Sequence, residues 1–330
     1  MALAASMLAH AEDVLHGKKL VFLVGAPRSG TTWLQLLLSR SPSLVTAHET
    51  HLFNVFMRSM VEAWNHDGNT GARIGLTNLL SEEEFQALLR GVSGIVLAKI
   101  AAAKPSATVI LEKTPNHVNC WREILKLWPD AHFIHIIRDP RSVVASLRVA
   151  SKSWASNWAS PRISANCERW ISDVGNGRQI SSATDNYQEV KFESLKSDGP
   201  QVLRQLLSGL GVPSSLEECQ RYAEECRIEN LKAGNLDNAP FEMTNRNQSY
   251  RIGSTDSWRV ELSRWEIALV ERMAALPMSE LGFEPVNGTK AVSVFVDAGW
   301  RTWKVARAAK RSLRQFAQRR GFVRGRLGCF

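Results

Sequence analysis

The residues best suited to chemistry lie in one short stretch, Gly25–Trp33, which reads GAPRSGTTW. It follows an apolar run, Leu20–Val24, that predicts a buried strand, and it precedes leucines typical of a buried helix. The free N–H groups and the dipole at a helix start favour anions. Arg28, Thr31 and Thr32 add side-chain donors, so we expect this loop to hold a phosphate.

The spacing separates this loop from that of nucleoside triphosphatases. Gly25, Gly30 and Thr32 approach the pattern G-x-x-x-x-G-K-[ST], but Thr31 stands where that pattern has lysine. A cation comes earlier, at Arg28. This departure points away from ATP or GTP and toward a sulfonate donor. The alternatives are a kinase that uses ATP and a non-catalytic nucleotide-binding protein.

A second pair with useful spacing is Arg138 and Ser146. Arg138 ends an apolar run at 132–137, and Asp139-Pro140 can begin the next helix, with aspartate as cap and proline at the first position. Ser146 then lies about two turns along that helix. The alternative for Arg138 is an ion pair with Asp139 or another acid.

The predicted elements alternate. Strands are expected at 20–24, 44–46, 108–111, 132–137 and 187–192. Helices are expected after residue 33, over most of 54–106 with a cap at Ser81, up to residue 128, at 140–149, and at about 200–210, 215–230 and 262–275. This order predicts an α/β protein with a doubly wound parallel sheet flanked by helices. The strand ends then gather 47–53 and the other strand–helix turns near the phosphate loop.

Four stretches, in order over residues 20–285, resemble the sulfotransferases that use PAPS (3′-phosphoadenosine 5′-phosphosulfate). The loop PRSGTTW resembles their 5′-phosphosulfate loop, and Arg138 with Ser146 resembles their 3′-phosphate site. KFESL at 191–195 resembles their RYEDL strand end, and 251–253 resembles a closing RKG loop. Arg28, where cytosolic members have lysine, is more similar to the bacterial and carbohydrate-directed branches.

The resemblance implies the P-loop-like sulfotransferase fold and a set of donor contacts. Trp33 would pack against adenine, while Phe192 and Ile252 depart from the tyrosine and cation of the family. The implied donor-binding residues are Arg28, Ser29, Gly30, Thr31, Thr32, Trp33, Arg138, Ser146, Phe192, Arg251 and Gly253.

Transfer of a sulfuryl group from PAPS to an acceptor, which the resemblance implies, needs a base that removes the acceptor's proton. Glu49, in HETHLF, resembles the catalytic glutamate of glycan- and tyrosyl-directed sulfotransferases. His117, in EKTPNH, lies near the place where cytosolic members carry a catalytic histidine. We favour Glu49, whose neighbours His48 and His51 can each tune it.

Two cations complete the implied chemistry. Lys113 resembles a lysine that polarises the sulfuryl group in glycan sulfotransferases, and Arg28 would hold the leaving oxygen. The alternative for Lys113 is an ordinary ion pair with Glu112 or Glu49. We expect no metal, since the sulfate carries a single charge.

The charge of the chain is concentrated at its C-terminus. Of a net charge of +9, ten basic residues lie from Arg301 onward, and no acid follows Asp297. We therefore divide the chain into a sulfotransferase domain, 1–287, and a basic amphipathic helix or tail, 288–330. Residues 300–330 would bind a membrane surface or an acidic partner, or remain a solvated tail. Nucleic-acid binding is not expected, because the body lacks a recognisable module.

Composition suggests the setting of the enzyme. The 330 residues, 44% of them hydrophobic, include five cysteines without metal-like spacing, which favours a reducing compartment. We find no basic leader and no apolar run approaching a membrane span, so we expect a cytoplasmic protein that can associate with membranes peripherally.

The acceptor is expected to be a hydroxyl, less readily an amine, of a glycan, glycolipid or lipid-like small molecule. Trp154, Trp158 and Trp170 either line a sugar or lipid site or pack a flap and a core helix, and we favour packing.

Overall fold

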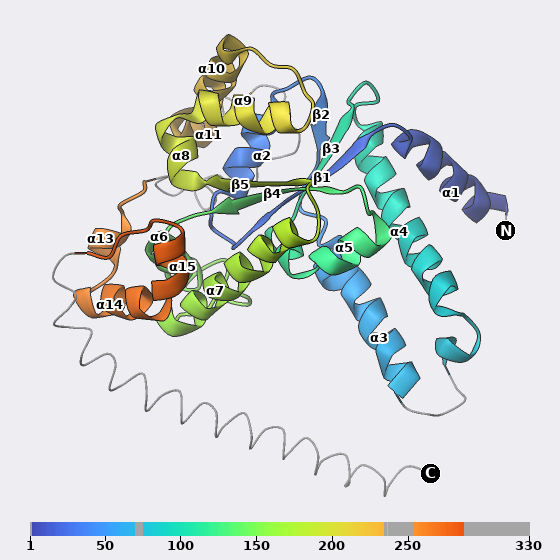
Figure 1. Cartoon of the computed structure of the whole chain (residues 1–330), viewed down its shortest axis with the longest axis horizontal. Helices are drawn as coiled ribbons and strands as arrows, with labels where there is room; N and C mark the ends of the chain where they lie inside the picture. Colours follow the sequence, from blue (N-terminus) through green and yellow to red (C-terminus); the bar gives the residue numbers. More distant parts are fainter. Residues whose placement is uncertain (1, 70–74, 234–235, 237–253, 287–330) are drawn as a thin grey trace, which may run out of the picture.

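The computed structural model describes residues 2–69, 75–233, 236 and 254–286. Within them five parallel strands form one sheet in the order β2-β3-β1-β4-β5 (Figure 1). The strands are β1 (Lys19–Gly25), β2 (Leu44–Thr46), β3 (Val109–Lys113), β4 (His132–Ile137) and β5 (Tyr187–Lys191). The prediction of a parallel α/β sheet is confirmed.

The helices pack on both sides of this sheet (Figure 1). The first half of the chain contributes α1 (Ala2–Leu15), α2 (Thr31–Ser39), the π-helix η1 (Leu52–Met57), α3 (Arg58–Asn69), η2 (Leu76–Asn78), α4 (Glu82–Ala102), η3 (Pro115–Asn119), α5 (Trp121–Leu127) and α6 (Pro140–Ala150). The second half contributes α7 (Ile163–Gln179), η4 (Ile180–Ser182), α8 (Phe192–Ser197), α9 (Gly199–Gly209), α10 (Leu216–Glu225), α11 (Ile228–Ala233), α13 (Trp258–Glu261), α14 (Arg264–Met273) and α15 (Ala275–Glu280).

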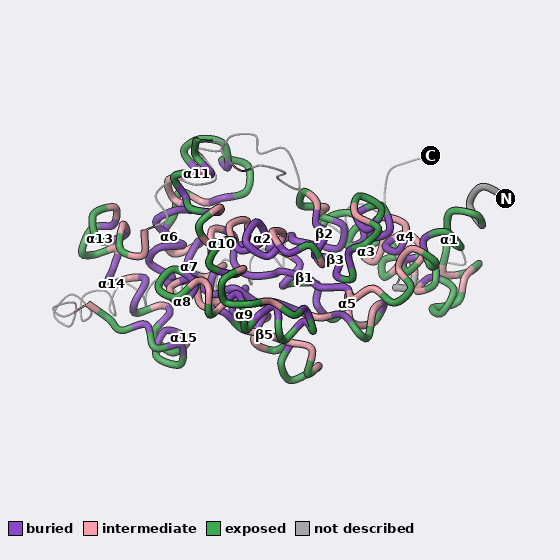
Figure 2. Tube along the Cα trace, turned by 90° about the horizontal axis from the view of Figure 1, so that it is seen from above, coloured by how far each residue is buried: buried purple, intermediate pink, exposed green. Residues whose placement is uncertain are grey.

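The central strand β1 faces two hydrophobic cores. Val21 and Leu23 pack into a core shared with α2 and α9, whereas Phe22 and Val24 pack into a core shared with α4 and α5. Side chains alternate across a strand, so a strand that is apolar at every position must be covered on both faces. Figure 2 shows β1 and α2 as buried segments, with exposed residues on the outer helices.

The predicted helix starts are confirmed where capping residues mark them. Ser81 and Glu84 form a capping box at the start of α4, and Asp139 caps α6 with Pro140 at its first position. The helix expected over 215–230 is instead divided into α10 and α11. The break is at Cys226, whose carbonyl accepts a hydrogen bond from Trp33 Nε1 at 2.9 Å instead of continuing the helix.

One expectation from the sequence was wrong. Among the described helices, α4 is long and apolar enough by length and composition to cross a membrane, although we found no such run in the sequence. In the structure α4 packs against α1, α5, β2 and β3 as a helix of the core. Of its apolar window, 44% is buried by this packing.

Two sequence predictions fall outside the described residues. They are the donor-closing loop with Arg251 and Gly253, and the basic C-terminal segment. The division of the chain at 287 and 288 remains a prediction.

Candidate active site

The site lies at the carboxyl edge of the sheet, where β1, β3 and β4 end side by side. Gly25 ends β1 and Lys113 ends β3, while Arg138 directly follows β4. Strand order changes direction on either side of β1, and such a switch point opens a crevice between the following loops. A cavity of about 510 Å³ occupies this position.

The loop after β1 has the conformation of an anion cradle. Gly30 caps α2 with a φ of 99°, and Arg28 has a φ of 75°, in the left-handed region that non-glycine residues seldom adopt. A Cβ on Gly30 would lie 2.5 Å from Cδ2 of Phe192. Glycine at this position thus allows α8 to approach the loop closely.

Polar groups in this loop fit a bound anion. The first N–H groups of α2 have no partner within the helix, and Thr31 and Thr32 border the cavity. Ser29 Oγ is fully buried and has no hydrogen-bond partner among the described residues. Burying a hydroxyl group without a hydrogen-bond partner costs free energy, and a bound ligand that supplies the partner removes this cost. The loop therefore fits a phosphate or phosphosulfate group.

Arg28, Arg138 and Ser146 meet on one wall of the cavity. Arg28 Nε donates to Ser146 Oγ at 3.0 Å, and Arg138 Nη1 donates to the Arg28 carbonyl at 3.2 Å. The Arg28 guanidinium also lies 5.5 Å from the ring centroid of Trp154. The sequence assigned Arg28 and Ser146 to different phosphates, but the structure brings them into contact.

Several buried contacts hold Arg138 in place. Its guanidinium lies 4.1 Å from the ring centroid of Phe192, and its carbonyl accepts from Trp170 Nε1 at 2.9 Å. The next N–H, of Asp139, donates to Glu193 Oε1 at 3.0 Å. Burial raises the pKa of Glu193. Phe192, predicted to contact the donor, thus packs against Arg138 and also lines the cavity.

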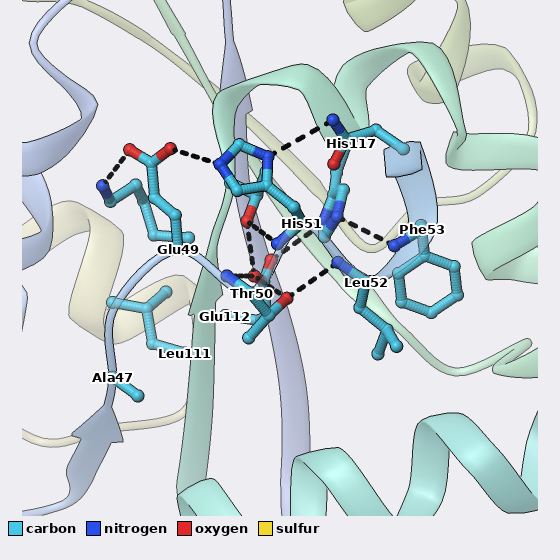
Figure 3. Close-up of polar contacts among 12 residues, drawn as sticks. Ala47, Glu49, Thr50, His51, Leu52, Phe53, Leu111, Glu112 and His117 are labelled. Atoms are coloured by element: carbon cyan, nitrogen blue, oxygen red, sulfur yellow. Dashed lines mark hydrogen bonds and ion pairs between the residues drawn. The ribbon is translucent and has the colours of Figure 1, made fainter. Parts of the chain in front are cut away.

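Glu49, which also lines the cavity, forms an ion pair with Lys113. Lys113 Nζ lies 2.6 Å from Glu49 Oε1 and donates to Thr32 Oγ1 at 3.2 Å. The other carboxylate oxygen of Glu49 lies 3.5 Å from His51 Nε2 (Figure 3). The lysine side chain is only 4% exposed, whereas that of Glu49 is 35% exposed. The predicted base therefore faces the cavity with a cation behind it.

A buried carboxylate fixes the segment that carries Glu49. Glu112 Oε1 accepts from the hydroxyls of Thr50 at 2.8 Å and Thr114 at 2.7 Å, and Oε2 contacts His117 Nδ1 at 2.8 Å (Figure 3). Burial alone would raise the pKa of Glu112, but the His117 ring and the two hydroxyls hold that pKa at about 2. Glu112 therefore joins the Thr50 backbone to the end of β3.

His117 lies behind this site and does not line the cavity. It is fully buried, Nδ1 contacts Glu112, and Nε2 accepts from the Phe53 N–H at 3.1 Å. Both ring nitrogens are engaged, so neither can take a proton from an acceptor in the cavity. The geometry of His117 therefore does not suit a base for the acceptor proton, whereas Glu49 lines the cavity.

Trp33 is held by three contacts in addition to facing the cavity. Its Nε1 donates to the Cys226 carbonyl, its ring lies 5.5 Å from that of Phe192, and Lys196 Nζ lies 5.5 Å from its centroid. A flat aromatic surface fixed in this way suits stacking against a planar base.

The mouth of the cavity contains two of the three tryptophans for which the sequence left a site role and a packing role open. Trp154 and Trp158 both line it, with 41% and 39% exposure, whereas Trp170 is fully buried. Packing was favoured for all three, and that preference suits only Trp170. Arg169 Nη2 donates to Asn116 Oδ1 at 2.7 Å and its guanidinium lies 5.4 Å from the Trp158 ring, so it connects two walls of the mouth.

Most of the sequence-predicted residues meet in this cavity. Those that line it are Arg28, Gly30, Thr31, Thr32, Trp33, Glu49, Arg138, Ser146 and Phe192. Ser29, Lys113 and His117 lie behind its surface. The lining also includes His51 and Asn116, which lie in the quoted motifs HETHLF and EKTPNH, and Asn54, Val55 and Ser142, which were not named from the sequence. In the described part of the chain, no group of three or more His, Cys, Asp and Glu side chains is arranged to hold a metal ion.

Comparison with known proteins gives a consistent family assignment. The model of the "Sulfotransferase family" matches residues 21–217. Protein-tyrosine sulfotransferase 1 of Danio rerio is 25% identical over 198 residues, which cover 59% of this chain and 53% of that protein. Nodulation protein NoeE of Sinorhizobium fredii is 28% identical over 149 residues, 44% of this chain and 33% of NoeE. The chain thus spans about half or less of the length of these relatives.

Two solved structures share the fold. The mouse sulfotransferase SULT7A1 complexed with PAP matches with a TM-score of 0.54 at 14% identity, covering 88% of this chain and 93% of that one. The sulfotransferase domain from the curacin biosynthetic pathway matches with a TM-score of 0.50 at 16% identity, covering 82% and 99%. At these identities the likeness concerns the fold alone.

Proposed function

The chain belongs to the sulfotransferase family, and on that premise we propose that it moves a sulfuryl group from PAPS to an acceptor hydroxyl and releases PAP. The observation that carries this proposal is the placement of two sets of residues at one cavity. Arg28, Arg138 and Ser146 form a cationic group in its lining, and Glu49 lines the same cavity with Lys113 paired behind it. This arrangement suits an anionic donor on one side and a hydroxyl on the other.

Each set has a distinct task. The N-terminus of α2 with Ser29, Thr31 and Thr32 would hold the 5′-phosphosulfate, and Arg138 with Ser146 the 3′-phosphate. The bound donor supplies an activated sulfuryl group. A hydroxyl beside Glu49 gives its proton to that carboxylate as its oxygen forms the new bond to sulfur, while the S–O bond to the nucleotide breaks.

Positive charge is needed where the sulfuryl oxygens and the leaving oxygen develop charge. Arg28 borders the cavity, and Lys113 Nζ lies within hydrogen-bond distance of both Thr32 and Glu49. When Glu49 becomes neutral on accepting a proton, the ion pair with Lys113 weakens. The ammonium group can then turn its N–H donors toward the sulfuryl group, so stabilisation increases as the transfer proceeds.

The acceptor that we propose is a glycan, glycolipid or other small molecule with a flat or apolar face next to its hydroxyl. Trp154, Trp158 and Val55 expose apolar surface at the mouth, and the rings of the two tryptophans lie 5.6 Å apart. Aromatic rings of this kind stack on sugar rings and on other planar groups. The names of the relatives add a phenolic hydroxyl, as in tyrosine, as the second acceptor class.

A transfer assay tests this function. The full chain is incubated with 35S-labelled PAPS and a panel of sugar, lipid-linked and phenolic hydroxyl compounds. We expect release of PAP that depends on the acceptor, with the 35S label recovered in a sulfate ester of that acceptor. Neither product should form without the enzyme. Release of no PAP with any hydroxyl, under conditions where the nucleotide binds, would refute the proposal.

We further propose that the enzyme acts in the cytoplasm and that residues 300–330 bring it to anionic membranes or an acidic partner. The ten basic residues from Arg301 onward support this. Removal of 300–330 should abolish sedimentation with vesicles containing phosphatidylserine and leave turnover of a soluble acceptor unchanged. Equal sedimentation of both forms would contradict the role of this segment.

A further inference from the structure

His51 is the one partner of Glu49 in the described structure that can receive a proton. Glu49 contacts two side chains, Lys113 at 2.6 Å and His51 at 3.5 Å. A lysine ammonium group has three N–H donors and no lone pair, whereas a neutral imidazole has one nitrogen that accepts. Resting on the proposed function, we propose that His51 takes the acceptor's proton from Glu49 and passes it to solvent.

The backbone turns the His51 ring toward Glu49. His51 has a φ of 52°, in the left-handed region, and it caps the π-helix η1. Both features are uncommon away from functional sites, because each costs conformational free energy. The His51 N–H donates to Thr114 Oγ1 at 3.3 Å, and Thr114 is itself bound to Glu112. The buried network therefore holds the backbone of His51 in this strained conformation.

Exposure gives the proton a route outward. Glu49 and His51 both line the cavity, and the His51 side chain is the more exposed of the two, at 47% against 35%. An imidazole is a stronger base in water than a carboxylate by about two pKa units, so transfer from a carboxylic acid to an imidazole is favourable. Release to water then restores the Glu49 carboxylate.

Asn54 can select the tautomer that this step requires. Asn54 Nδ2 lies 3.4 Å from His51 Nδ1, and Asn54 Oδ1 is buried without a hydrogen-bond partner among the described residues. A flip of the amide group exchanges these two atoms, so that Oδ1 accepts from Nδ1–H and the lone pair on Nε2 faces Glu49. The other charged groups that face this cavity are Arg28 and Arg138, and both lie on the donor wall.

The proton can be followed from the acceptor hydroxyl to water. The acceptor O–H bond breaks and a proton joins a Glu49 oxygen as the acceptor oxygen bonds to sulfur. That O–H bond then breaks and an N–H bond forms at Nε2 of His51. The imidazolium cation loses one proton to water, and both side chains return to their starting forms.

The test uses the full chain with His51→Gly, His51→Gln and, as a matched control, His66→Gln at an exposed position of α3. We expect kcat to fall at least tenfold in both His51 variants, since groups that move protons contribute about 10²–10⁴-fold. The kcat–pH profile of His51→Gln should differ in shape from that of the wild type, because glutamine has no ring nitrogen that can take up a proton. Added imidazole should restore His51→Gly, and the control should match the wild type.

Calorimetry with 3′,5′-ADP gives a readout that does not depend on turnover. The His51 variants should bind this nucleotide as the wild type does, since the His51 side chain contacts Glu49 and Asn54, which are not among the proposed donor-binding residues. Unchanged kcat and pH profile in His51→Gln, or a loss of activity that imidazole does not restore, would overturn the relay and leave sulfuryl transfer intact. A wild type that releases no PAP would instead refute the proposed function.

Discussion

Lys113 Nζ lies 2.6 Å from Glu49 Oε1, and this contact joins the end of β3 to the segment after β2. The pair places a carboxylate and a cation within reach of one acceptor hydroxyl. Thr32, on the donor side, contacts the same ammonium group. Lys113 is therefore the side chain through which the proposed base and the donor loop are connected.

Substitution Glu49→Gln should separate binding from chemistry. Glutamine keeps the size of the side chain but cannot take a proton at neutral pH. We expect kcat to fall by about 10²–10⁴-fold, in the range of general-base contributions, with 3′,5′-ADP affinity unchanged. Steady-state kinetics and calorimetry on one preparation measure both. Full turnover in this variant would show that another group is the base.

Substitution Arg138→Ala should weaken donor binding. Hydrogen bonds to charged groups contribute about 1.5–3 kcal/mol, so the affinity for 3′,5′-ADP should fall roughly 10- to 100-fold. The exposed Arg122, whose Nη2 contacts Gln179, provides a matched control, and Arg122→Ala should bind normally. Titration calorimetry measures the affinity of both variants for 3′,5′-ADP. Equal affinities in Arg138→Ala and Arg122→Ala would exclude Arg138 from the nucleotide site.

Substitution Gly30→Ala should distort the donor loop. The added methyl group would lie 2.5 Å from Phe192 Cδ2, at a φ of 99° that alanine seldom adopts. Phe192 also packs on Arg138, so the displacement should reach both proposed phosphate contacts. We expect loss of 3′,5′-ADP binding and a lower Tm. Gly175→Ala, in α7, where no atom lies within 4 Å of the added group, is the control that should keep nucleotide binding and should not lower Tm.

The Glu112 network predicts a specific acid sensitivity. The pKa of Glu112 is about 2 in the fold against 4.5 for an ordinary glutamate. The carboxylate therefore stabilises the fold above pH 4.5, and this contribution is lost as the pH falls below 4.5. Glu112→Gln should lower the free energy of unfolding at pH 7 and flatten this slope.

Urea unfolding at several pH values measures the effect of Glu112→Gln. Glu123→Gln, at an exposed position of α5, serves as the control and should keep the wild-type slope. A wild-type slope in Glu112→Gln as well would mean that the buried carboxylate does not carry the acid sensitivity.

The sheet and the donor wall could be predicted from local signals. Each buried strand is a short apolar run, and Gly30, Asp139 and Pro140 mark helix starts by their conformational preferences. The resemblance then supplied the roles of Arg138 and Ser146. Those signals are local in the sequence, so they can be recognised without a structure.

The acceptor side could not be predicted in the same way. Trp154 and Trp170 are the same residue type in neighbouring segments, yet one lines the cavity and the other is buried under Arg138. His51 and His117 were distinguished only by their surroundings, since one faces Glu49 and the other is enclosed by Glu112 and Phe53. Such differences arise from tertiary packing between distant segments.

The most direct test of the central claim is calorimetric titration of the full chain with 3′,5′-ADP and with 5′-ADP, without metal. The two nucleotides differ in the position of one phosphate. We predict a strong preference for 3′,5′-ADP, because Arg138 and Ser146 are placed to hold a 3′-phosphate. A preference for 5′-ADP, or for ATP with magnesium, would contradict the use of PAPS and favour a kinase.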